Sequence, residues 1–369
     1  MKSIKEHFFD LIKISIGKED VFLDISSDKE WVMLFVMAEK QSLTGALLIG
    51  LEKLPAVQRP PQGLLLEWIG AQQIVASTNK NQDRRSKELY EWFKEKGFDS
   101  CIIKGQGVAR LYPQPVLRQA GDIDIWVGGL TDATDISMLR DHVIGMMRDK
   151  DIEVSVVDYV NCHAAFFEDV EVEVHFRPTY FFNPFNNRKL QNWIVANKDE
   201  QMHHFDAEVG FAYPSIGFNL VFSLIHIYRH VFSEGIGLRQ LMDYYFILTH
   251  STQQEREAAY KTLQSFGIGK FVGVVMYVMR RVFAIDKTYL LCEPNNIEGE
   301  FLLNEIMRGG NFGHFDDRNG FVDSSHRFRR GINNVKRNFR FLTQYPSEVL
   351  WMPAWKVWHW CWRKRKGYL

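Results

Sequence analysis

The sequence lacks long apolar runs and has no excess of charge of either sign. No apolar stretch approaches the roughly 18 residues of a membrane-spanning helix, so we expect no transmembrane segment. Residues 1–20 carry too many charges to form the apolar core of a signal peptide. Lys plus Arg and Asp plus Glu each number 45, so there is no overall basic field of the kind that favours bulk binding of nucleic acid.

Cysteine is also scarce. The four cysteines are isolated in the sequence, at Cys101, Cys162, Cys292 and Cys361. This spacing excludes a paired-cysteine zinc or redox motif, and a reducing cytoplasm is the simplest location. Apolar residues make up 46% of the sequence and aromatic residues 14%, which predicts a folded protein with a sizeable core.

Acidic and apolar residues alternate in residues 121–127, GDIDIWV. On a strand, side chains two positions apart share a face, so Asp122 and Asp124 would point one way and Ile123 and Ile125 would be buried on the other. Two like charges side by side repel each other. A divalent cation such as Mg²⁺, which prefers carboxylate oxygens, would explain the pair. The alternative is a half-exposed edge strand with its acids in water.

The residues before this motif suggest a phosphate-binding turn. Residues 100–103 form a short apolar segment typical of a strand, and Lys104, Gly105, Gln106 and Gly107 follow directly. Glycine lets backbone amides come close to a ligand, and a lysine beside it neutralises phosphate charge. A short helix over 108–112, ended by prolines, would lead back to the acidic strand.

These segments resemble the nucleotidyltransferase superfamily that includes polymerase beta, whose signature is an apolar residue, Gly, Gly or Ser, a spacer and an acid-apolar-acid strand. More narrowly, they resemble a bacterial nucleotidyltransferase family with the core LKG…lYp.p..R..gDiDilV. The matching residues here are Ile103-Lys104-Gly105, Leu111-Tyr112-Pro113, Arg118 and 121–127. The chain departs from the superfamily in having Gln106 at the second small position and a slightly longer spacer.

The superfamily also needs a third acid on a neighbouring strand. Residues 170–176, VEVEVHF, alternate strictly, so Glu171, Glu173 and His175 share one face of a predicted strand. The narrower family has an acid two residues before a histidine here, which points to Glu173 and leaves Glu171 as the second candidate. An exposed alternating strand would give the same pattern.

The resemblance implies transfer of a nucleoside monophosphate from a nucleoside triphosphate to an acceptor hydroxyl, with release of pyrophosphate. Two Mg²⁺ (or Mn²⁺) ions bridged by Asp122 and Asp124, one of them also held by Glu173, would align the reactants. Three further residues would bind the nucleotide phosphates: Lys104 and Arg118 through their charge, and Gly105 through its backbone.

The acceptor is left open between a small molecule, a sugar, an RNA end and a protein, and electroneutrality disfavours a long nucleic acid. Two alternatives to this enzyme remain. One is a catalytically inactive binding or regulatory protein, which Gln106 permits and the presence of all three acids opposes. The other is a toxin-like nucleotidyltransferase that acts on tRNA or protein.

The predicted fold class is α+β, with a small mixed β-sheet core flanked by N-terminal and C-terminal helical regions. We predict a helical region over 1–96, the nucleotidyltransferase α/β core over 97–187 and a helical domain over 188–369. Apolar spacing predicts helices over 31–54 and 64–93, the second being one long helix or two. In the core we predict strands at 100–103, 121–127, 152–160, 164–167 and 170–176, and a helix over 131–150.

Two pairs of residues in the C-terminal region are four positions apart on predicted helices. His226 and His230 could hold a transition metal, but without a third ligand we favour packed or hydrogen-bonded histidines. Arg239 and Asp243 would form a helix salt bridge worth about 0.2–0.5 kcal/mol. Similar positions recur in the narrower family, so the resemblance makes His175, His226, Arg239 and Asp243 candidates for the substrate side of the site.

The C-terminal tail is rich in tryptophan and basic residues. Trp351, Trp355, Trp358 and Trp362 form one stripe of a predicted helix, followed by four basic residues at 363–366. Such a helix could lie in a membrane interface or contact a polyanion. Packing against the body of the protein gives the same stripe, and we favour it. A second basic run precedes the tail: Arg327, Arg329, Arg330, Lys336, Arg337 and Arg340.

Overall fold

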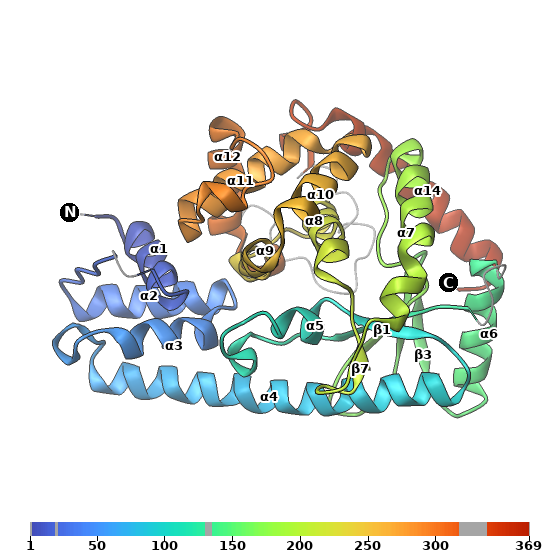
Figure 1. Cartoon of the computed structure of the whole chain (residues 1–369), viewed down its shortest axis with the longest axis horizontal. Coiled ribbons are helices and arrows are strands. Elements are labelled where there is room, and N and C mark those ends of the chain that lie inside the picture. The colour runs from blue at the N-terminus through green and yellow to red at the C-terminus, as the bar shows by residue number, and fades with distance from the viewer. Residues whose placement is uncertain (1, 19–20, 130–134, 317–337, 369) are drawn as a thin grey trace. The chain divides into compact units, whose positions relative to one another are not determined.

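The computed structural model describes residues 2–18, 21–129, 135–316 and 338–368 (Figure 1). Most of its regular structure is helical, and one small mixed sheet lies among helices, which confirms the predicted α+β class. None of the helices in these ranges is long and apolar enough to cross a membrane. Of the basic run before the tail, all residues except Arg340 lie outside the described ranges.

The chain divides into two compact units, each built from segments far apart in the sequence. Unit 1 comprises residues 1–80, 111–120 and 233–321, and unit 2 comprises 81–110, 121–232 and 322–369. The division of the sequence into 1–96, 97–187 and 188–369 stays a prediction about its linear organisation.

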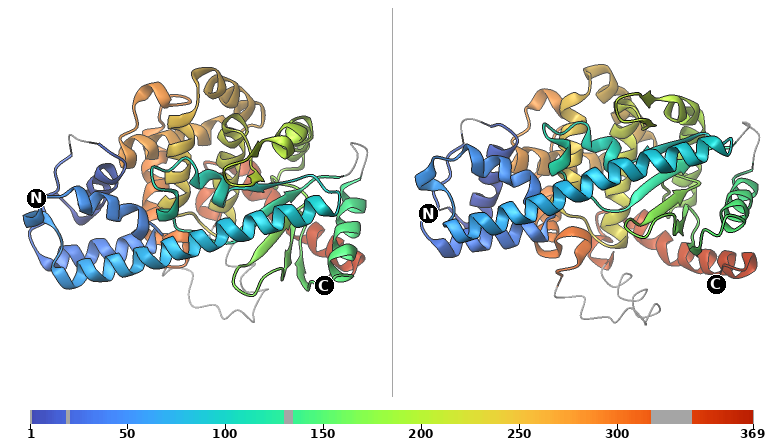
Figure 2. Two further views of the ribbon diagram at one scale, coloured as in Figure 1. Left: turned by 60° about the horizontal axis from the view of Figure 1, so that its bottom comes forward. Right: turned by 90° about the horizontal axis from the view of Figure 1, so that it is seen from below.

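Unit 1 is helical. Its elements are α1 (Ile4–Ser15), α2 (Asp28–Lys40), α3 (Thr44–Lys53), η1 (Ala56–Gln58), the first part of α4 (Gln62–Glu95), η2 (Pro115–Leu117), α9 (Leu238–His250), α10 (Gln253–Ser265), α11 (Gly269–Phe283), η3 (Lys287–Tyr289), α12 (Asn296–Gly309) and η4 (Asn311–Gly313). The predicted helix over 31–54 is two helices, because Ser42 has a φ of 55° and breaks the hydrogen-bond ladder between α2 and α3. The other predicted helix is one continuous element, α4 (Figure 2).

Unit 2 contains the sheet. Its elements are the rest of α4, β1 (Ser100–Ile103), α5 (Gly105–Ala109), β2 (Ile123–Val127), α6 (Ile136–Arg148), β3 (Val154–Val157), β4 (Asn161–Ala164), β5 (Val172–His175), α7 (Pro184–His203), β6 (Phe205–Asp206), β7 (Phe211–Ala212), α8 (Ile216–Ser233), η6 (Phe339–Phe341) and α14 (Pro346–Lys366). The strand order is β1-β2-β5-β4-β3, with β2 and β5 parallel and every other pair antiparallel. β6 and β7 form a separate ribbon.

Each predicted strand overlaps an observed one; β1 has the predicted ends, and the ends of the other four are shifted. The largest shift is in β4, which covers Asn161–Ala164 where we predicted 164–167. Phe166 and Phe167 instead lie in the loop after β4, where Phe166 packs against Trp92 and Phe93 of α4. The apolar residues that suggested a strand are therefore used for packing between the loop and the helix. β4 pairs with β5 in the antiparallel direction.

Candidate active site

The register of the central strands brings two predicted acids together. Asp124 of β2 lies beside Glu173 of β5, and His175 is two residues further along β5 on the same face. Ile103, the last residue of β1, pairs with Asp124 on its other side, so Lys104 emerges directly next to the acids. The sheet topology alone therefore assembles a cluster from three strands.

Lys104 contacts the acids of this cluster directly. Its Nζ lies 2.7 Å from Oδ1 of Asp124, and both side chains are largely buried. Burial by itself would lower the pKa of Lys104, but the charges of Asp124, Glu173 and Asp122 outweigh it and raise that pKa. Lys104 is therefore held as a cation in the position where a positive charge is most strongly favoured.

His175 bridges the two carboxylates from within the core. Its Nε2 lies 2.7 Å from Oδ1 of Asp124 and 3.2 Å from Oε2 of Glu173, while Nδ1 lies 3.2 Å from the carbonyl oxygen of Arg177. Both ring nitrogens thus face acceptors, an arrangement that suits the doubly protonated imidazolium. Burial would lower the pKa of His175, but the hydrogen bonds to Asp124 and Glu173 outweigh it and raise that pKa.

Glu173 contacts polar side chains of both β4 and β5. Besides His175, it accepts a hydrogen bond from Nδ2 of Asn161 at 2.5 Å, and Nε2 of His163 lies 3.4 Å from its other oxygen. Burial opposes ionisation, but the hydrogen bond and charge of His175, with further help from Lys104, hold the pKa of Glu173 below its ordinary value. Glu173 is therefore ionised. By contrast, Glu171 is exposed and lies outside β5.

The pKa of Asp122 is shifted in the opposite direction from that of Glu173. It directly precedes β2 and retains solvent exposure, although protein surrounds much of it. The charge of Asp124, then burial, then the charge of Glu173 raise the pKa of Asp122 to about 6. The charge of Lys104 offsets this only in part. Three carboxylates thus face two cations, and the cluster carries an excess of negative charge.

The turn after β1 has the unusual backbone that the Lys-Gly-Gln-Gly sequence suggested. Lys104 has a φ of 59° and Gly105 a φ of 27°, both in the region that side chains disfavour. At Gly107 a β-carbon would lie 2.8 Å from Cβ of Tyr213 and 3.2 Å from the carbonyl oxygen of Ile102. Glycine is therefore required at Gly107 by the close approach of β1 and the segment after β7.

Gln106, which departs from the superfamily pattern, anchors this turn to α4. Its Nε2 donates to Oδ1 of Asp83 at 2.7 Å, and one terminal nitrogen of Arg110 contacts both oxygens of the same carboxylate, at 2.7 and 2.9 Å. The side chain of Gln82, the residue before Asp83, donates to the carbonyl oxygen of Gly121, just before Asp122. The second half of α4 thus positions both segments that carry the charged residues.

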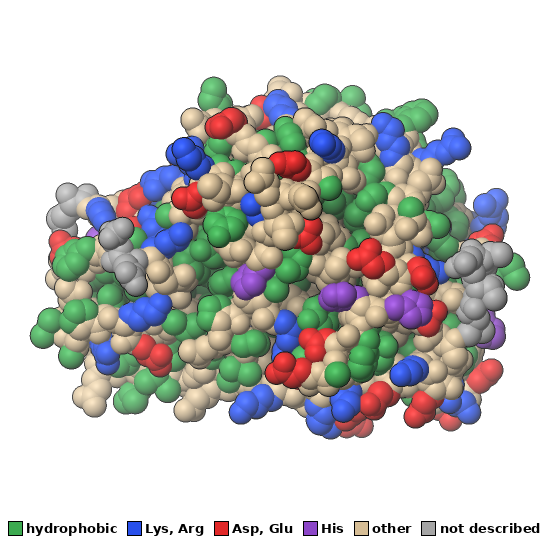
Figure 3. Space-filling view, viewed as in Figure 1, with side chains coloured by type: hydrophobic (Ala, Val, Ile, Leu, Met, Phe, Trp, Pro, Cys, Tyr) green, Lys and Arg blue, Asp and Glu red, His purple; other side chains and the backbone are tan. Residues whose placement is uncertain are grey.

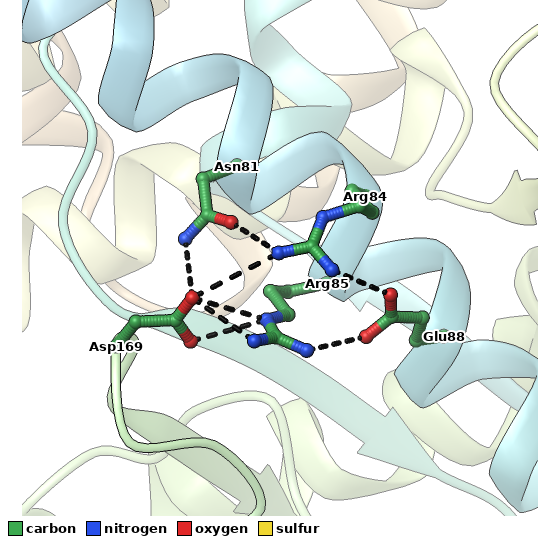
Figure 4. Close-up of polar contacts among 5 residues, drawn as sticks. All are labelled: Asn81, Arg84, Arg85, Glu88 and Asp169. Atoms are coloured by element: carbon green, nitrogen blue, oxygen red, sulfur yellow. Dashed lines mark hydrogen bonds and ion pairs between the residues drawn. The ribbon is translucent and has the colours of Figure 1, made fainter.

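A second polar network ties α4 to the loop between β4 and β5 (Figure 4). Asp169 accepts a hydrogen bond from Nδ2 of Asn81 at 3.0 Å and forms an ion pair with Arg85 at 3.0 Å. Arg84 and Arg85 also pair with Glu88 of the same helix. The network is partly exposed, so its stabilisation is modest. The network fixes the position of this loop on α4, and the loop leads directly into β5, the strand that bears Glu173.

The donor set fits a hard divalent cation. One carboxylate oxygen of Asp124 and one of Glu173 lie within 4.8 Å of each other, and His175 holds both side chains by hydrogen bonds. Asp122 adds a carboxylate whose raised pKa shows that a further positive charge nearby would be favourable. Carboxylates that repel each other and share too few cations are the arrangement that Mg²⁺ or Mn²⁺ stabilises.

His226 and His230 face each other on α8 within unit 2. Their ring centroids are 4.2 Å apart in an edge-to-face arrangement. Burial, then the charges of Lys104 and His230, lower the pKa of His226 well below its ordinary value, so His226 is neutral. In the described part of the chain, these two histidines do not belong to a group of three metal ligands.

Three other predicted residues lie in unit 1. Arg118 is buried and forms a two-pronged ion pair with Asp243, at 2.7 Å from Nε and 2.8 Å from the terminal nitrogen. The hydroxyl of Tyr112 donates to the same carboxylate at 2.7 Å. Arg239 donates to the carbonyl oxygen of Gln119 at 3.0 Å. These contacts join Arg118, Arg239 and Asp243 to protein groups of unit 1, and the roles of the three residues toward substrate stay predictions.

The sequence matches a known protein family. A family model described as an uncharacterised nucleotidyltransferase matches residues 27–284, which is more than half of the chain. The chain belongs to this nucleotidyltransferase family. No curated protein matches the sequence. The matched range includes all five strands of the main sheet and the whole acidic cluster.

In this nucleotidyltransferase, sequence reasoning missed the residues that support the cluster. Asn161 and His163 contact Glu173 because β4 lies beside β5, with His163 directly paired to Glu173. The alternating segment around β4 carried this signal, but the shifted strand prediction excluded both residues. The contacts of Gln82 and Asp83 depend on how α4 packs in unit 2, which no local sequence pattern reveals.

Proposed function

We propose that this nucleotidyltransferase moves a nucleoside monophosphate from a nucleoside triphosphate to an acceptor hydroxyl, with a divalent cation held by Asp122, Asp124 and Glu173. The observation that carries the proposal is the pairing of Asp124 with Glu173 on neighbouring strands, which brings one carboxylate oxygen of each within 4.8 Å of the other. Membership of a nucleotidyltransferase family supports the reaction class. The excess of negative charge in the cluster supports a resident cation.

In the proposed reaction, the acceptor oxygen bonds to the α-phosphorus, the bond from that phosphorus to pyrophosphate breaks, and the hydroxyl proton is released. A bound Mg²⁺ or Mn²⁺ would neutralise phosphate charge and lower the pKa of the attacking hydroxyl. His175 orients the carboxylates of Asp124 and Glu173 by its bridging hydrogen bonds. Lys104, now paired with Asp124, exchanges this carboxylate for a phosphate oxygen of the triphosphate.

A compact acceptor fits the charge distribution better than a long nucleic acid. Acidic and basic side chains are interspersed over the face shown in Figure 3, and the formal net charge of the chain is +0. A long polyanion is usually held by a continuous basic surface. We therefore place the acceptor among small molecules, sugars, short RNA ends and proteins.

The first test needs no knowledge of the acceptor. We would measure thermal unfolding of the wild type and of Asp122→Asn/Asp124→Asn with each nucleoside triphosphate, with and without Mn²⁺. A nucleotide present at ~100 times its dissociation constant stabilises the folded state by about 2.7 kcal/mol. We expect a metal-dependent shift in the wild type and none in the variant. Equal shifts in both proteins would contradict the assignment.

The chain provides a matched control on the same strand segment. Glu173→Gln removes an acid of the cluster, whereas Glu171→Gln makes the same change at an exposed position two residues earlier. We expect the metal-dependent shift to be lost in Glu173→Gln and kept in Glu171→Gln. Release of pyrophosphate in the presence of a metabolite extract then separates an active enzyme from the non-catalytic alternative.

A further inference from the structure

Helix α14 carries apolar side chains on two opposite faces, and only one of them is packed. On the packed face Met352 is buried, and Trp355 stacks on Tyr180 with ring centroids 4.6 Å apart. Trp355 and Trp362 also contact the ring of Tyr159 edge-on. Figure 1 shows α14 beside α7 and α6 of the same unit. Part of the predicted tryptophan stripe therefore packs against the body of unit 2.

The opposite face of α14 is exposed and apolar. Leu350 is 64% exposed, Val357 65% and Trp360 54%. Together with Ala354 and Cys361, which are also exposed, they follow the spacing of one side of a helix. A surface helix normally carries charged or polar residues on this side. An apolar outer face indicates a contact with something other than water.

The charge along this face has one sign. No Asp or Glu occurs in residues 349–369, and Glu348 is buried with its carboxylate on the backbone amides of Phe182 and Asn183. Four basic residues end the helix at 363–366. Lys364 and Arg365 are exposed, and the ammonium of Lys364 lies 5.4 Å from the ring centroid of Trp360. The exposed face is thus apolar with a cationic end.

We propose that α14 docks in the plane of an anionic phospholipid surface. Leu350, Val357 and Trp360 would enter the headgroup region, and Lys364 and Arg365 would contact lipid phosphates. This combination of aromatic and aliphatic residues with lysine and arginine is typical of interfacial helices. Basic residues near a bilayer gain from the negative potential of anionic lipids. The proposal is independent of the nucleotidyl transfer reaction.

The size of the face argues against a second copy of the chain as its occupant. Residues 350–361 span roughly 18 Å of helix, and a helix is about 10 Å wide, which gives a footprint near ~180 Å². A stable protein interface buries about 800 Å² on each partner. A narrow apolar strip is sufficient for a membrane, because the bilayer adapts to it and the basic residues add long-range attraction.

The test is cosedimentation of the full chain with vesicles. We expect the wild type to bind vesicles of phosphatidylcholine mixed with phosphatidylglycerol, and to bind pure phosphatidylcholine vesicles about tenfold more weakly or less. Val357→Asp/Trp360→Ser should weaken binding to the anionic vesicles by about tenfold or more. Lys364→Glu/Arg365→Glu should reduce binding to the level seen with pure phosphatidylcholine.

Ile297→Asp is the matched control, since Ile297 is 87% exposed and lies on α12 of the other unit. It should bind like the wild type, and circular dichroism should show that every variant keeps its helices. Wild-type protein that stays in the supernatant with anionic vesicles would overturn the proposal. So would a folded Val357→Asp/Trp360→Ser variant that sediments like the wild type, or a dimer in sedimentation velocity that this variant alone dissociates.

Discussion

Two buried charge clusters, one in each unit, differ in their balance of charge. In unit 1 one carboxylate, Asp243, faces the guanidinium of Arg118 in a two-pronged pair and also accepts from Tyr112. In unit 2 three carboxylates face the ammonium of Lys104 and the imidazolium of His175. Both clusters contain residues that the sequence suggested as functional.

The difference separates an ion pair whose charges match from a cluster in which acids outnumber cations. A buried carboxylate and guanidinium with matched geometry satisfy each other, and such a pair is retained for structure. Where acids outnumber cations, the pKa of one of the acids is raised, as it is at Asp122. Perturbed groups of this kind mark functional sites more often than structural ones. Charge balance, more than burial, therefore distinguishes the candidate active site.

Breaking the balanced pair should have the largest effect on stability. Arg118→Ala leaves the largely buried carboxylate of Asp243 without its guanidinium partner. We expect the free energy of unfolding to fall by about 3–5 kcal/mol, as measured by urea unfolding. The double variant Arg118→Met/Asp243→Leu removes both charges and should recover most of the loss. If the single variant is as stable as the wild type, the pair is not structural.

Glu348 sharpens the comparison, because it is a buried carboxyl without a cationic partner in the described structure. It accepts the backbone N–H groups of Phe182 and Asn183, each at 3.0 Å, and burial raises the pKa of Glu348 to about 7 from an ordinary value near 4.5. Between these values the folded state binds more protons than the unfolded state. The free energy of unfolding should therefore decrease by roughly 3 kcal/mol as pH rises through this window.

Urea unfolding at both ends of the window would measure this dependence. Glu348→Gln has no ionisable group, so its free energy of unfolding should change much less with pH. At low pH the variant should be less stable than the wild type by about 1 kcal/mol, because the amide can accept only one of the two N–H groups well. A wild-type pH dependence that persists in Glu348→Gln would assign it to other groups.

The turn that carries Lys104 can be tested through its close backbone approach. In Gly107→Ala the new methyl group would lie 2.8 Å from Cβ of Tyr213, so we expect a loss of about 1–3 kcal/mol in thermal or urea unfolding. Gly145→Ala is the control, since Gly145 lies in α6 with nothing within 4 Å of the new methyl group. It should stabilise the protein by about 0.5–1 kcal/mol through helix propensity. Equal effects would contradict the packing of the turn.

The parts of this fold that the sequence predicts are those with strong local patterns. Alternation predicted β2 and β5 and the shared face of Glu173 and His175, and glycine with lysine predicted the turn after β1. The break between α2 and α3 was missed because it occurs at Ser42, which adopts a positive φ, and no glycine or proline marks this position in the sequence. A conformation of that kind depends on tertiary packing and leaves no local signal.

The candidate site was predictable in its acids and not in their surroundings. The contact of Gln106 with Asp83 joins residues 23 positions apart in sequence, and it exists only because α4 packs beside α5. The tail was predictable in part, since the tryptophan stripe that we expected to pack supplies Trp355 and Trp362 to the packed face of α14. Packing selected Trp355 and left Trp360 exposed.

The smallest expected effect comes from the cluster in which acids outnumber cations, and the direction of the change in stability is what tests it. Asp122 has its pKa raised to about 6 from an ordinary value near 3.8, so the folded state binds an extra proton between these values and loses stability as pH rises through them. Asp122→Asn removes this repulsion. Because Asp122 keeps contact with water, we expect only about 0.2–0.5 kcal/mol of added stability above pH ~6, and none well below pH ~4. Urea unfolding in a chelator would measure it, and added Mn²⁺ should reverse the order by stabilising only the wild type. A variant that is less stable than the wild type in the chelator would mean that Asp122 is matched within the fold, as Asp243 is, and that the two clusters do not differ in kind.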